Sequence, residues 1–531
     1  MCQTPFPSTG MRTWLAALAV LLGCASTGAQ APPPSQSPFE SPAAPTSHGR
    51  IDELVFAKLA RLNIEPAHLS PDAVFLRRVY LDTIGTLPSI DEARAFLADT
   101  DPNKRGALID RLLERDEFAD YWAMRWSDVL RVKSEFPINL WPNAAQAYHR
   151  WIRASISDRV PYDRFARQLL TESGSNFRVG PVNFYRAVQS RDPRAIASAV
   201  ALTFMGTRAQ NWPKDRLAGL AAFFSQIGYK PTGEWKEEIV FFDEEKPAPR
   251  AAVFPDGTPA RIAPGQDPRE VFAAWLVAPN NPWFARSIVN RVWFWLLGRG
   301  IVHEPDDIRP DNPPVNPELL AFLEQELVKA RYDLRGVYRL ILNSSTYQLS
   351  PIPRTDRAEA EANFAHALLR PLDAEVLIDA ICGLTGTTEQ YASAIPEPYT
   401  FIPPEQRSIA LPDGSITSTF LETFGRAPRD TGLLSERTNR PTTSQRLYLL
   451  NASDIQRRLQ QSAKLQALMP GGADGKQVVV NVYLAILSRF PTTDEMKVVA
   501  DYGQTSGGNR RIVALDLAWA LINSAEFRYR H

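Results

Sequence analysis

The residues best suited to chemistry are polar side chains that lie in or beside apolar segments of the second half of the chain. Asn290 and Arg291 stand inside the apolar run SIVNRVWFWLL, where an unpaired buried polar group would cost about 1–3 kcal/mol. The candidates together are Asn290, Arg291, Arg309, Asn312, Asn343, Tyr347, Glu436, Arg437 and Gln445. Such a set either locks loops to helices through buried hydrogen bonds or lines a shared polar pocket.

No familiar reaction motif accompanies these residues. The sequence has no Ser-His-Asp order, no P-loop and no GxGxxG pattern that would point to a named chemistry. The catalytic residues therefore stay unassigned. The pocket remains one of two interpretations, and it predicts that Asn290, Arg309, Asn343 and Glu436 meet in one concavity.

Ligands for a metal or a haem are scarce. The chain has 3 Cys and 6 His, and the histidines are scattered without HxH or HxxxH spacing. A structural zinc site normally needs four nitrogen or sulfur ligands. Oxygen groups gather in EPDDIRPDN, where Asp306, Asp307, Asp311 and Asn312 form either a polar turn or a site for a cation such as Ca²⁺. We expect the polar turn, and we predict neither a metal nor a cofactor.

The cysteine and tryptophan positions favour packing. Cys382 lies on an apolar helical stripe, and we expect it to be a small buried hydrophobe. Trp122 and Trp126 are four residues apart and therefore share one helix face, which is typical of a core. The alternative for some of the 12 Trp is an exposed position where the ring stacks on a sugar.

The amino terminus has the pattern of an export signal. Arg12 precedes a short apolar run, Trp14–Leu22, which is too short for a membrane-spanning helix. The following Leu21-Leu22-Gly23-Cys24 resembles a bacterial lipobox, so we expect Cys24 to be lipidated and to become the first mature residue. The predicted partner at this end is the membrane, reached through the lipid anchor.

Alternatives stay open at this terminus. Translation starts at Met1 or at Met11, and the segment Ala29-Gln30-Ala31 offers a site for ordinary cleavage and simple secretion. An uncut apolar anchor is a third possibility. Residues 32–48 are rich in proline and serine, which predicts a solvated tether between the anchor and the folded body.

Length and charge describe the body that must position these groups. A chain of 531 residues is too long for one ordinary core, so two folded units are expected. Lys and Arg number 59, as do Asp and Glu, and a zero net charge argues against a nucleic-acid partner. The hydrophobic fraction of 44% is typical of a globular protein.

Apolar periodicity predicts helix after helix, with no sustained alternation that would favour strands. Ser70 is expected to cap a helix that has Pro71 in its first turn, and Ser89–Glu92 forms a capping box. Expected helices cover 51–62, 92–98, 104–115, 118–132, 144–155, 162–171, 195–205, 217–227, 270–276, 283–297, 317–330, 334–343, 373–384, 443–450, 453–468, 477–487, 494–502 and 510–523.

The helical pattern breaks in the middle of the chain. The segments EIVFFDEE and RAAVFPDGTPARI predict two short strands around a turn rich in proline and glycine. The fold class is therefore mostly α, with two helical domains joined by a short β or irregular segment. The predicted divisions are a signal (1–23), a tether (24–49), an amino-terminal helical domain (50–228), a linker (229–268) and a carboxy-terminal helical domain (269–531).

Ordered motifs along this body resemble one pair of families. FLRRVYLDTIGTLPS, YWAMRWSDVLR and LAGLAAFF in the first half are similar to the planctomycete-type domain of unknown function that often lies beside c-type cytochrome domains. NPWFARSIVNRVWFWLLGRGIV, YDLRGVYRLILNSSTYQLS and RPTTSQRLYLLN are similar to its usual carboxy-terminal companion. The resemblance covers nearly all of residues 50–531 and implies an exported, mostly helical envelope protein.

One departure from the family pattern concerns haem. The resemblance implies a Cys-x-x-Cys-His stretch shortly before LAAFF, because two thiols and an axial histidine are what covalent haem attachment needs. Here the segment reads FMGTRAQNWPKDRLAGLAAFF, with Trp212 and Pro213 where the ligands are expected. A thioether-linked haem cannot form there, and we predict a member without covalent haem.

These inferences lead to one expected function and two alternatives. We expect an exported, lipid-anchored protein of the cell envelope or periplasm that acts as an accessory to another exported protein. The first alternative is an enzyme for envelope or polysaccharide substrates, with its site in the polar cluster of the second half. The second is an electron-transfer component that binds haem without covalent attachment.

Overall fold

The computed structural model describes residues 37–249, 251–438, 440–469, 474–506 and 509–531. Residues 38–531 form one compact unit. The predicted signal, Cys24 and the start of the tether lie outside the described residues. In the part of the chain that is described, no helix is long and apolar enough to cross a membrane.

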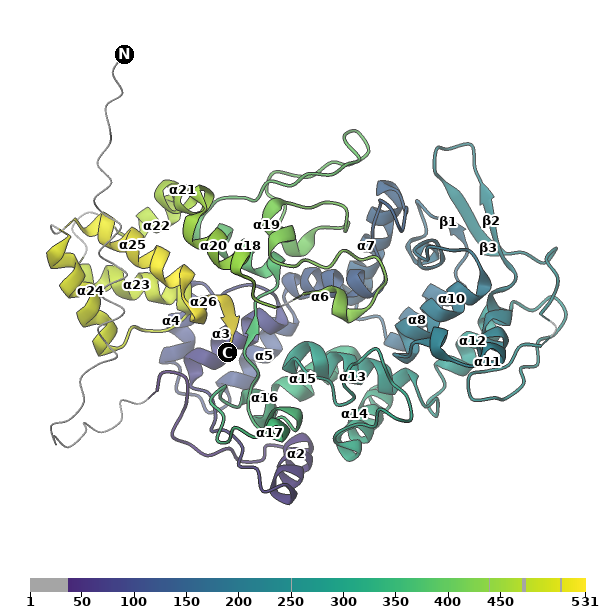
Figure 1. Cartoon of the computed structure of the whole chain (residues 1–531), viewed down its shortest axis with the longest axis horizontal. Coiled ribbons are helices and arrows are strands. Elements are labelled where there is room, and N and C mark those ends of the chain that lie inside the picture. The colour runs from purple at the N-terminus through teal and green to yellow at the C-terminus, as the bar shows by residue number, and fades with distance from the viewer. Residues whose placement is uncertain (1–36, 250, 439, 470–473, 507–508) are drawn as a thin grey trace, which may run out of the picture. The chain divides into compact units, whose positions relative to one another are not determined.

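Helices dominate the first half of the body (Figure 1), which confirms the mostly α fold class. They are α2 (Arg50–Arg61), α3 (Asp72–Thr83), α4 (Ile90–Ala98), α5 (Lys104–Leu113), α6 (Asp116–Val129), α7 (Pro142–Ser157), α8 (Tyr162–Thr171), α9 (Asn183–Arg186), α10 (Pro193–Val200) and α11 (Lys214–Ala221). Short 3₁₀ or π turns lie at η2 (Gly180–Val182), η3 (Ala201–Met205), η4 (Ala209–Asn211) and η5 (Ala222–Phe224).

Two of these helices, α4 and α3, begin in different ways: α4 has a side-chain cap and α3 has none. At α4 the capping box is present as predicted, because the Ser89 side chain accepts from the Glu92 N–H and the Glu92 carboxylate accepts from the Ser89 N–H. At α3 the prediction was wrong. Pro71 is the N-cap, and the Ser70 hydroxyl donates instead to the Gln348 carbonyl oxygen, at 2.9 Å. The Ser70 hydroxyl therefore bonds to a residue far along the chain and does not cap the helix.

A small sheet replaces the end of one expected helix. Its order is β1 (Gly174–Ser175), β3 (Glu238–Phe242) and β2 (Ile227–Pro231), all antiparallel. The strand at EIVFFDEE is confirmed, but the helix expected over 217–227 ends early, since Ile227 already pairs with Phe242. The second expected strand is reduced to one isolated bridge between Val253 and Pro259.

The second half is again helical. Its helices are α12 (Pro268–Leu276), α13 (Phe284–Leu297), α14 (Pro317–Lys329), α15 (Leu334–Leu342), α16 (Ser345–Gln348), α17 (Ala358–Ala362), α18 (Ala374–Thr385), α19 (Thr419–Thr423), α20 (Thr443–Asn451), α21 (Ser453–Gln461), α22 (Ala463–Ala467), α23 (Gly475–Leu487), α24 (Thr493–Thr505), α25 (Arg510–Asn523) and α26 (Ala525–Arg528). Two 3₁₀ turns, η6 (Ser408–Ala410) and η7 (Leu434–Glu436), and a two-stranded sheet of β4 (Arg370–Pro371) and β5 (Tyr529–Arg530) complete it.

One expected helix is divided in two. The segment predicted as a helix over 453–468 forms α21 and α22, which are separated at Ser462. The Ser462 side chain accepts a hydrogen bond from the Leu465 N–H at 2.9 Å and so begins a new helix. Apolar spacing alone cannot reveal such a break, because it continues through both segments.

The two helical halves share one core. α2 packs on α14 and α16, α5 packs on α15, α4 packs on α23, and α8 packs on α12. The last strand, β5, contacts α3, and Figure 1 places the carboxyl end beside that helix. The predicted domain boundaries stay a prediction. The contacts nevertheless make residues 38–531 a single packed body.

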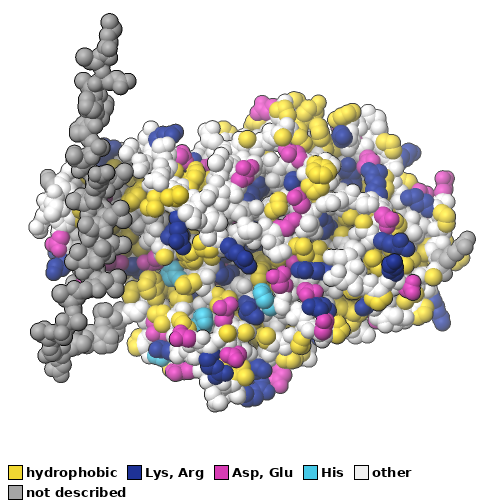
Figure 2. All heavy atoms as spheres, in the orientation of Figure 1, with side chains coloured by type: hydrophobic (Ala, Val, Ile, Leu, Met, Phe, Trp, Pro, Cys, Tyr) yellow, Lys and Arg dark blue, Asp and Glu magenta, His cyan; other side chains and the backbone are white. Residues whose placement is uncertain are grey.

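The surface carries both signs of charge. On the face in Figure 2, basic and acidic side chains are interspersed among hydrophobic ones rather than gathered by sign. This distribution agrees with the zero net charge of the whole chain.

Candidate functional site

The two polar residues inside α13 have buried structural partners. The Asn290 amide exchanges two hydrogen bonds with the backbone of Val302, each 2.9 Å long. The Arg291 guanidinium donates to the Thr203 carbonyl oxygen at 2.7 Å and pairs with Asp306 at 3.0 Å. Both α13 side chains are fully buried, so they hold neighbouring segments against the helix.

Three other candidates make short-range contacts near the surface. Arg309 is half exposed and pairs with Asp307 at 3.0 Å and with Asp311 at 2.5 Å. Asn312 donates to the Asp307 carbonyl oxygen at 2.9 Å. Asn343 donates in the same way to the Arg339 carbonyl oxygen at 2.8 Å.

In the loop EPDDIRPDN, the carboxylates considered as ligands for a cation form ion pairs with arginines. Asp306 pairs with Arg291, while Asp307 and Asp311 both pair with Arg309. Within the described residues, no group of three His, Cys, Asp or Glu side chains is arranged to hold a metal ion. The expectation of a polar turn fits these contacts.

Glu436 and Gln445 organise the local backbone. The Glu436 carboxylate accepts from the N–H groups of Asp430 and Thr431. Burial raises the pKa of Glu436, although the hydrogen bonds at Thr431 act in the opposite direction. Gln445 closes a capping box with Thr442 at the start of α20. Within the described residues, neither side chain shares a hydrogen-bond or ion-pair partner with Asn290, Arg309 or Asn343, so common contacts do not join the nine candidates.

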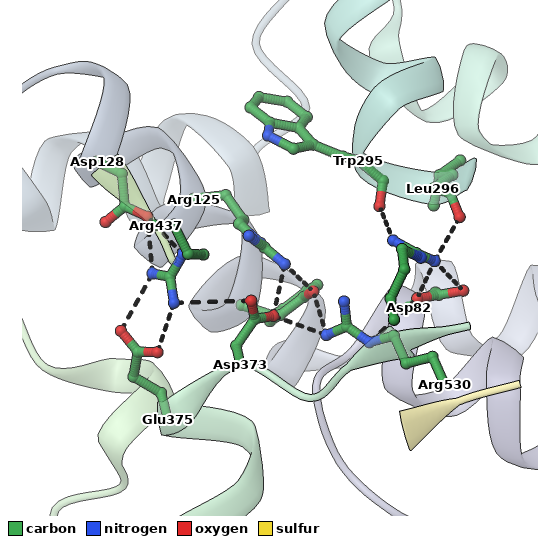
Figure 3. A network of polar contacts seen from close by, with 11 residues as sticks. Asp82, Arg125, Asp128, Trp295, Leu296, Asp373, Glu375, Arg437 and Arg530 are labelled. Atoms are coloured by element: carbon green, nitrogen blue, oxygen red, sulfur yellow. Dashed lines mark hydrogen bonds and ion pairs between the residues drawn. The ribbon is translucent and has the colours of Figure 1, made fainter. Parts of the chain in front are cut away.

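Two remaining candidates belong to a buried network of arginines and carboxylates (Figure 3). Arg437 lies between two acids. Its Nη2 donates to Asp128 at 2.7 Å, and its Nη1 donates to Glu375 at 2.6 Å. At the other end of the network, the Tyr347 hydroxyl donates to Asp82 at 3.0 Å.

Asp373 is the centre of this network. One of its oxygens accepts from Arg125 at 2.5 Å and from Arg530 at 2.7 Å, and Arg437 lies 3.7 Å from the other oxygen. The Tyr121 hydroxyl accepts from the same two guanidinium groups, Arg125 and Arg530, at 3.0 and 3.1 Å. Figure 3 shows these side chains converging from separate elements.

The network continues to α3 and α13. Arg530 lies 3.3 Å from Asp82, and Arg370 pairs with the same carboxylate at 3.1 Å. The Arg370 guanidinium also donates to the carbonyl oxygens of Trp295 and Leu296, at 2.9 and 2.7 Å, near the end of α13. A helix carries partial negative charge at its carboxyl end, so this guanidinium is well placed.

The electrostatics keep the central acids ionised. Burial alone would raise the pKa of Asp373, but Arg125, Arg530 and Arg437 hold it far below its usual range. Burial also opposes ionisation of Glu375, and Arg437 with Arg426 lowers its pKa nonetheless. Arg426 itself has a pKa lowered to about 10 by burial and by the neighbouring Arg429. Acids held ionised in this way cannot supply a proton to a reaction near neutral pH.

Small cavities flank the network. One of 20 Å³ is lined in part by Arg78, Arg370 and Arg530, and one of 30 Å³ lies beside Leu377 and Tyr529. Spaces of this size can each hold a water molecule. The arrangement therefore supports bridging hydrogen bonds rather than binding of a sizeable substrate.

A larger cleft of 460 Å³ lies between α4, α18 and α22. Its polar lining includes Arg115, Asp379 and Lys464. Arg115 pairs with Glu92 at 2.9 Å, and the Lys464 ammonium donates to the Gly383 carbonyl oxygen at 3.0 Å. These groups are therefore already engaged within the chain.

Cys382 and the tryptophan pair occupy packing positions. Trp122 and Trp126 are both buried, as predicted. Cys382 packs against the core but is only partly buried, and the Arg458 guanidinium donates to its sulfur at 3.1 Å. Burial raises the pKa of the Cys382 thiol to about 11, so it is protonated at neutral pH.

Sequence reasoning missed most members of the network. Asp82, Arg125, Asp128, Asp373, Glu375 and Arg530 were not singled out. A usable signal was present, since Asp82 and Arg125 stand in strongly apolar helical segments where a charge needs a partner. The identity of that partner could not be deduced, because the paired residues lie in opposite halves of the chain.

Two protein-family models match separate regions of the chain. Residues 50–214 match the PSCyt2 family model, described as a protein of unknown function (DUF1549). Residues 268–502 match the PSD1 family model, described as a protein of unknown function (DUF1553). No curated protein and no solved structure matches the chain. The network joins the two matched regions, with Asp82, Arg125 and Asp128 in the first. The chain thus belongs to the group of proteins that carry these paired planctomycete-type domains of unknown function.

Proposed function

We propose that this chain is an exported, lipid-anchored envelope protein that acts as an accessory or interaction protein without covalent haem. The observation that carries the accessory role is the buried network, in which Arg437 links Asp128 of the first family region to Glu375 of the second. The network uses its ionisable groups to hold one body together. Such a body is suited to presenting surfaces to other envelope components.

The sequence supports the remaining parts of the proposal. The lipobox at Cys24 supports the anchor, and the proline-rich tether after it would hold the body away from the membrane surface. In the segment where the family resemblance implies haem ligands, the Arg216 guanidinium covers the Trp212 ring at 4.0 Å. An arginine–tryptophan contact stands there, and no thiol is available for a thioether bond.

The anchor is tested by mass spectrometry of the mature amino terminus from the native envelope. We expect a peptide that begins at Cys24 and carries acyl chains. Replacing Cys24 by Ser is expected to release the protein from the membrane fraction. An unmodified terminus after Ala31, or an unchanged distribution of the C24S variant, would contradict the lipid anchor.

The accessory role is tested by cross-linking and purification of the full chain from the same envelope. We expect a defined exported protein to co-purify in a fixed ratio, and we expect no covalent-haem signal in a denaturing gel stained for peroxidase activity. Turnover of an envelope substrate by the purified protein alone would overturn the accessory role. A stained band would overturn the absence of covalent haem.

A further inference from the structure

The strongly exposed apolar side chains differ in chemistry from one region to another. On three loops they are aromatic: Phe136, Trp235, Tyr399 and Phe401, with exposed fractions of 80%, 68%, 47% and 64%. On α20, α24 and α25 they are aliphatic: Leu447, Leu450, Val498 and Ile512. Exposed apolar groups that gather in one place mark binding surfaces, whereas single ones need no explanation.

The aromatic loops meet on one surface. The rings of Trp141 and Tyr399 have centroids 5.2 Å apart and are inclined at 62°. The Lys236 ammonium lies 5.3 Å from the Trp235 ring and 5.8 Å from the Trp141 ring, so the two indoles flank one cation. Figure 1 shows the turn between β2 and β3 that carries Trp235. We call Trp141, Trp235 and Tyr399, together with the exposed Phe136 and Phe401 on the same loops, the aromatic surface.

The loops under the aromatic surface are held in place by polar contacts. The Glu135 carboxylate accepts from the Ala394 N–H at 3.2 Å, and the Glu135 N–H donates to the Ser415 hydroxyl at 2.9 Å. The neighbouring Ser134 N–H donates to Asp413 at 2.9 Å. Rings on loops that are fixed in this way lose little conformational entropy when a ligand binds.

The chemistry of the aromatic surface fits a sugar polymer. Tryptophan and tyrosine offer flat apolar faces together with polar edges. A pyranose ring has a face of C–H groups that packs on such a ring and a rim of hydroxyls that need hydrogen-bond partners. Lys236 and Glu234 lie beside the exposed Trp235 and supply a donor and an acceptor of that kind.

Other polymers fit this surface less well. A nucleic acid needs an excess of positive charge, but the acidic Glu234 lies two residues from Lys236, next to Trp235. The centre of a protein interface normally includes aliphatic side chains as well. Among the described residues, the strongly exposed large aliphatic ones stand elsewhere, four of them on α20, α24 and α25.

We infer that the aromatic surface binds the pyranose rings of a polysaccharide chain. This inference deepens the proposed accessory role, and it rests on that role because an exported protein is the one that meets envelope polysaccharides. The inclined pair of Trp141 and Tyr399 receives one sugar ring, and the exposed Trp235, whose ring also contacts Lys236, receives another. Binding therefore depends on several rings together.

Affinity electrophoresis of the full mature chain tests the inference, in native gels that contain hydroxyethyl cellulose, laminarin or alginate. We expect retardation in at least one of these gels. The Trp235→Ala and Tyr399→Ala variants are expected to bind that polymer about tenfold more weakly or worse, since they lose central aromatic contacts. Tryptophan emission of the wild type should shift on addition of the polymer, and the shift should shrink in Trp235→Phe.

Phe490→Ala is the matched control, because Phe490 is also an exposed aromatic residue but lies between α23 and α24. We expect it to bind like the wild type, and circular dichroism should show that all variants fold. Absence of retardation in all three gels, or an equal loss in the control, would overturn the inference. So would self-association that depends on Trp235 without polymer binding. None of these results would affect the amino-terminal acylation that tests the anchor.

Discussion

His149 shows how burial determines the charge of a single side chain. It lies on the buried face of α7, and its Nε2 has no hydrogen-bond partner among the described residues. Burial, together with the nearby Arg429 and Arg153, lowers the pKa of His149 to about 3. The imidazole is therefore neutral in the folded protein at any pH near neutrality.

This charge state predicts a pH dependence of stability. The unfolded chain binds a proton at His149 near pH 6.5, whereas the folded chain does not until about pH 3. The free energy of unfolding should consequently fall as the pH decreases below about 6.5, by up to about 1.4 kcal/mol per pH unit for this one proton. Denaturant unfolding between pH 7 and pH 5 measures the slope.

His149→Gln should make that slope shallower by about one proton equivalent. The buried His531, whose pKa burial lowers to about 3, remains in the variant and preserves part of the slope. The pKa values of Asp373 and Glu375 are lowered, so both acids stay ionised between pH 5 and pH 7 and do not contribute to the slope there. Identical slopes for the variant and the wild type would show that His149 is protonated in the folded state.

At the scale of an element, the turn after α10 depends on a glycine. The π segment η3 ends at Gly206, which has a φ of 61°, in the left-handed region. A Cβ there would lie 2.9 Å from the Pro305 carbonyl oxygen and 2.9 Å from the Ser287 hydroxyl. The same glycine accepts a hydrogen bond from the Ile308 N–H at 2.8 Å, so it joins η3 to the loop after α13.

Gly206→Ala is therefore expected to destabilise the protein by about 2 kcal/mol or more, through backbone strain and the close approach of Pro305. Gly475→Ala is the control, since Gly475 lies in the first turn of α23 with open space around its Cα. Its replacement should be neutral or stabilise by up to about 1 kcal/mol. Urea midpoints of the two variants that move in the same direction would contradict this account.

At the scale of the whole molecule, the arginine–carboxylate network decides whether the two family regions behave as one body. Arg437 is nearly fully buried between Asp128 and Glu375. Removing its charge leaves two buried acids without their main partner, a change that typically costs about 3–5 kcal/mol. Arg437→Met should lower the urea midpoint accordingly, and unfolding should remain a single transition in the wild type.

Arg309→Met is the matched control for this prediction. Arg309 belongs to the same set of sequence candidates, but it is half exposed, and its ion pairs within the described residues are with its neighbours Asp307 and Asp311. Exposed ion pairs contribute little to the free energy of unfolding, so the urea midpoint of Arg309→Met should not differ measurably from that of the wild type. A comparable loss in both variants would mean that the network does not hold the halves together.

The helices could be predicted from the sequence because their causes are local. The expected helix over 162–171 matches α8, and the capping box at Ser89 begins α4 as predicted. Apolar spacing and capping groups act within one or two turns. The predictions failed where a distant residue intervened, as when the Ser70 hydroxyl turned to Gln348 and when Ile227 joined a sheet with Phe242.

The candidate site was predicted only in part. Asn290 and Arg291, which stand in an apolar segment, were correctly singled out as needing partners, and Arg437 from the loop before α20 also has buried ones. The same candidate set included Arg309 in the polar loop EPDDIRPDN, and the structure leaves Arg309 half exposed. Only the burial of each side chain in the folded protein distinguishes Arg437 from Arg309.

The sequence by itself determined the family, the helical class and the scarcity of metal and haem ligands, since these depend on composition and local order. Tertiary structure alone decided which charges meet. Tyr121 and Arg530 share a hydrogen bond across 409 positions, and the rings of Trp141 and Tyr399 belong to distant loops. Such pairs form because chain folding brings remote segments together, and no periodicity along the chain encodes that proximity.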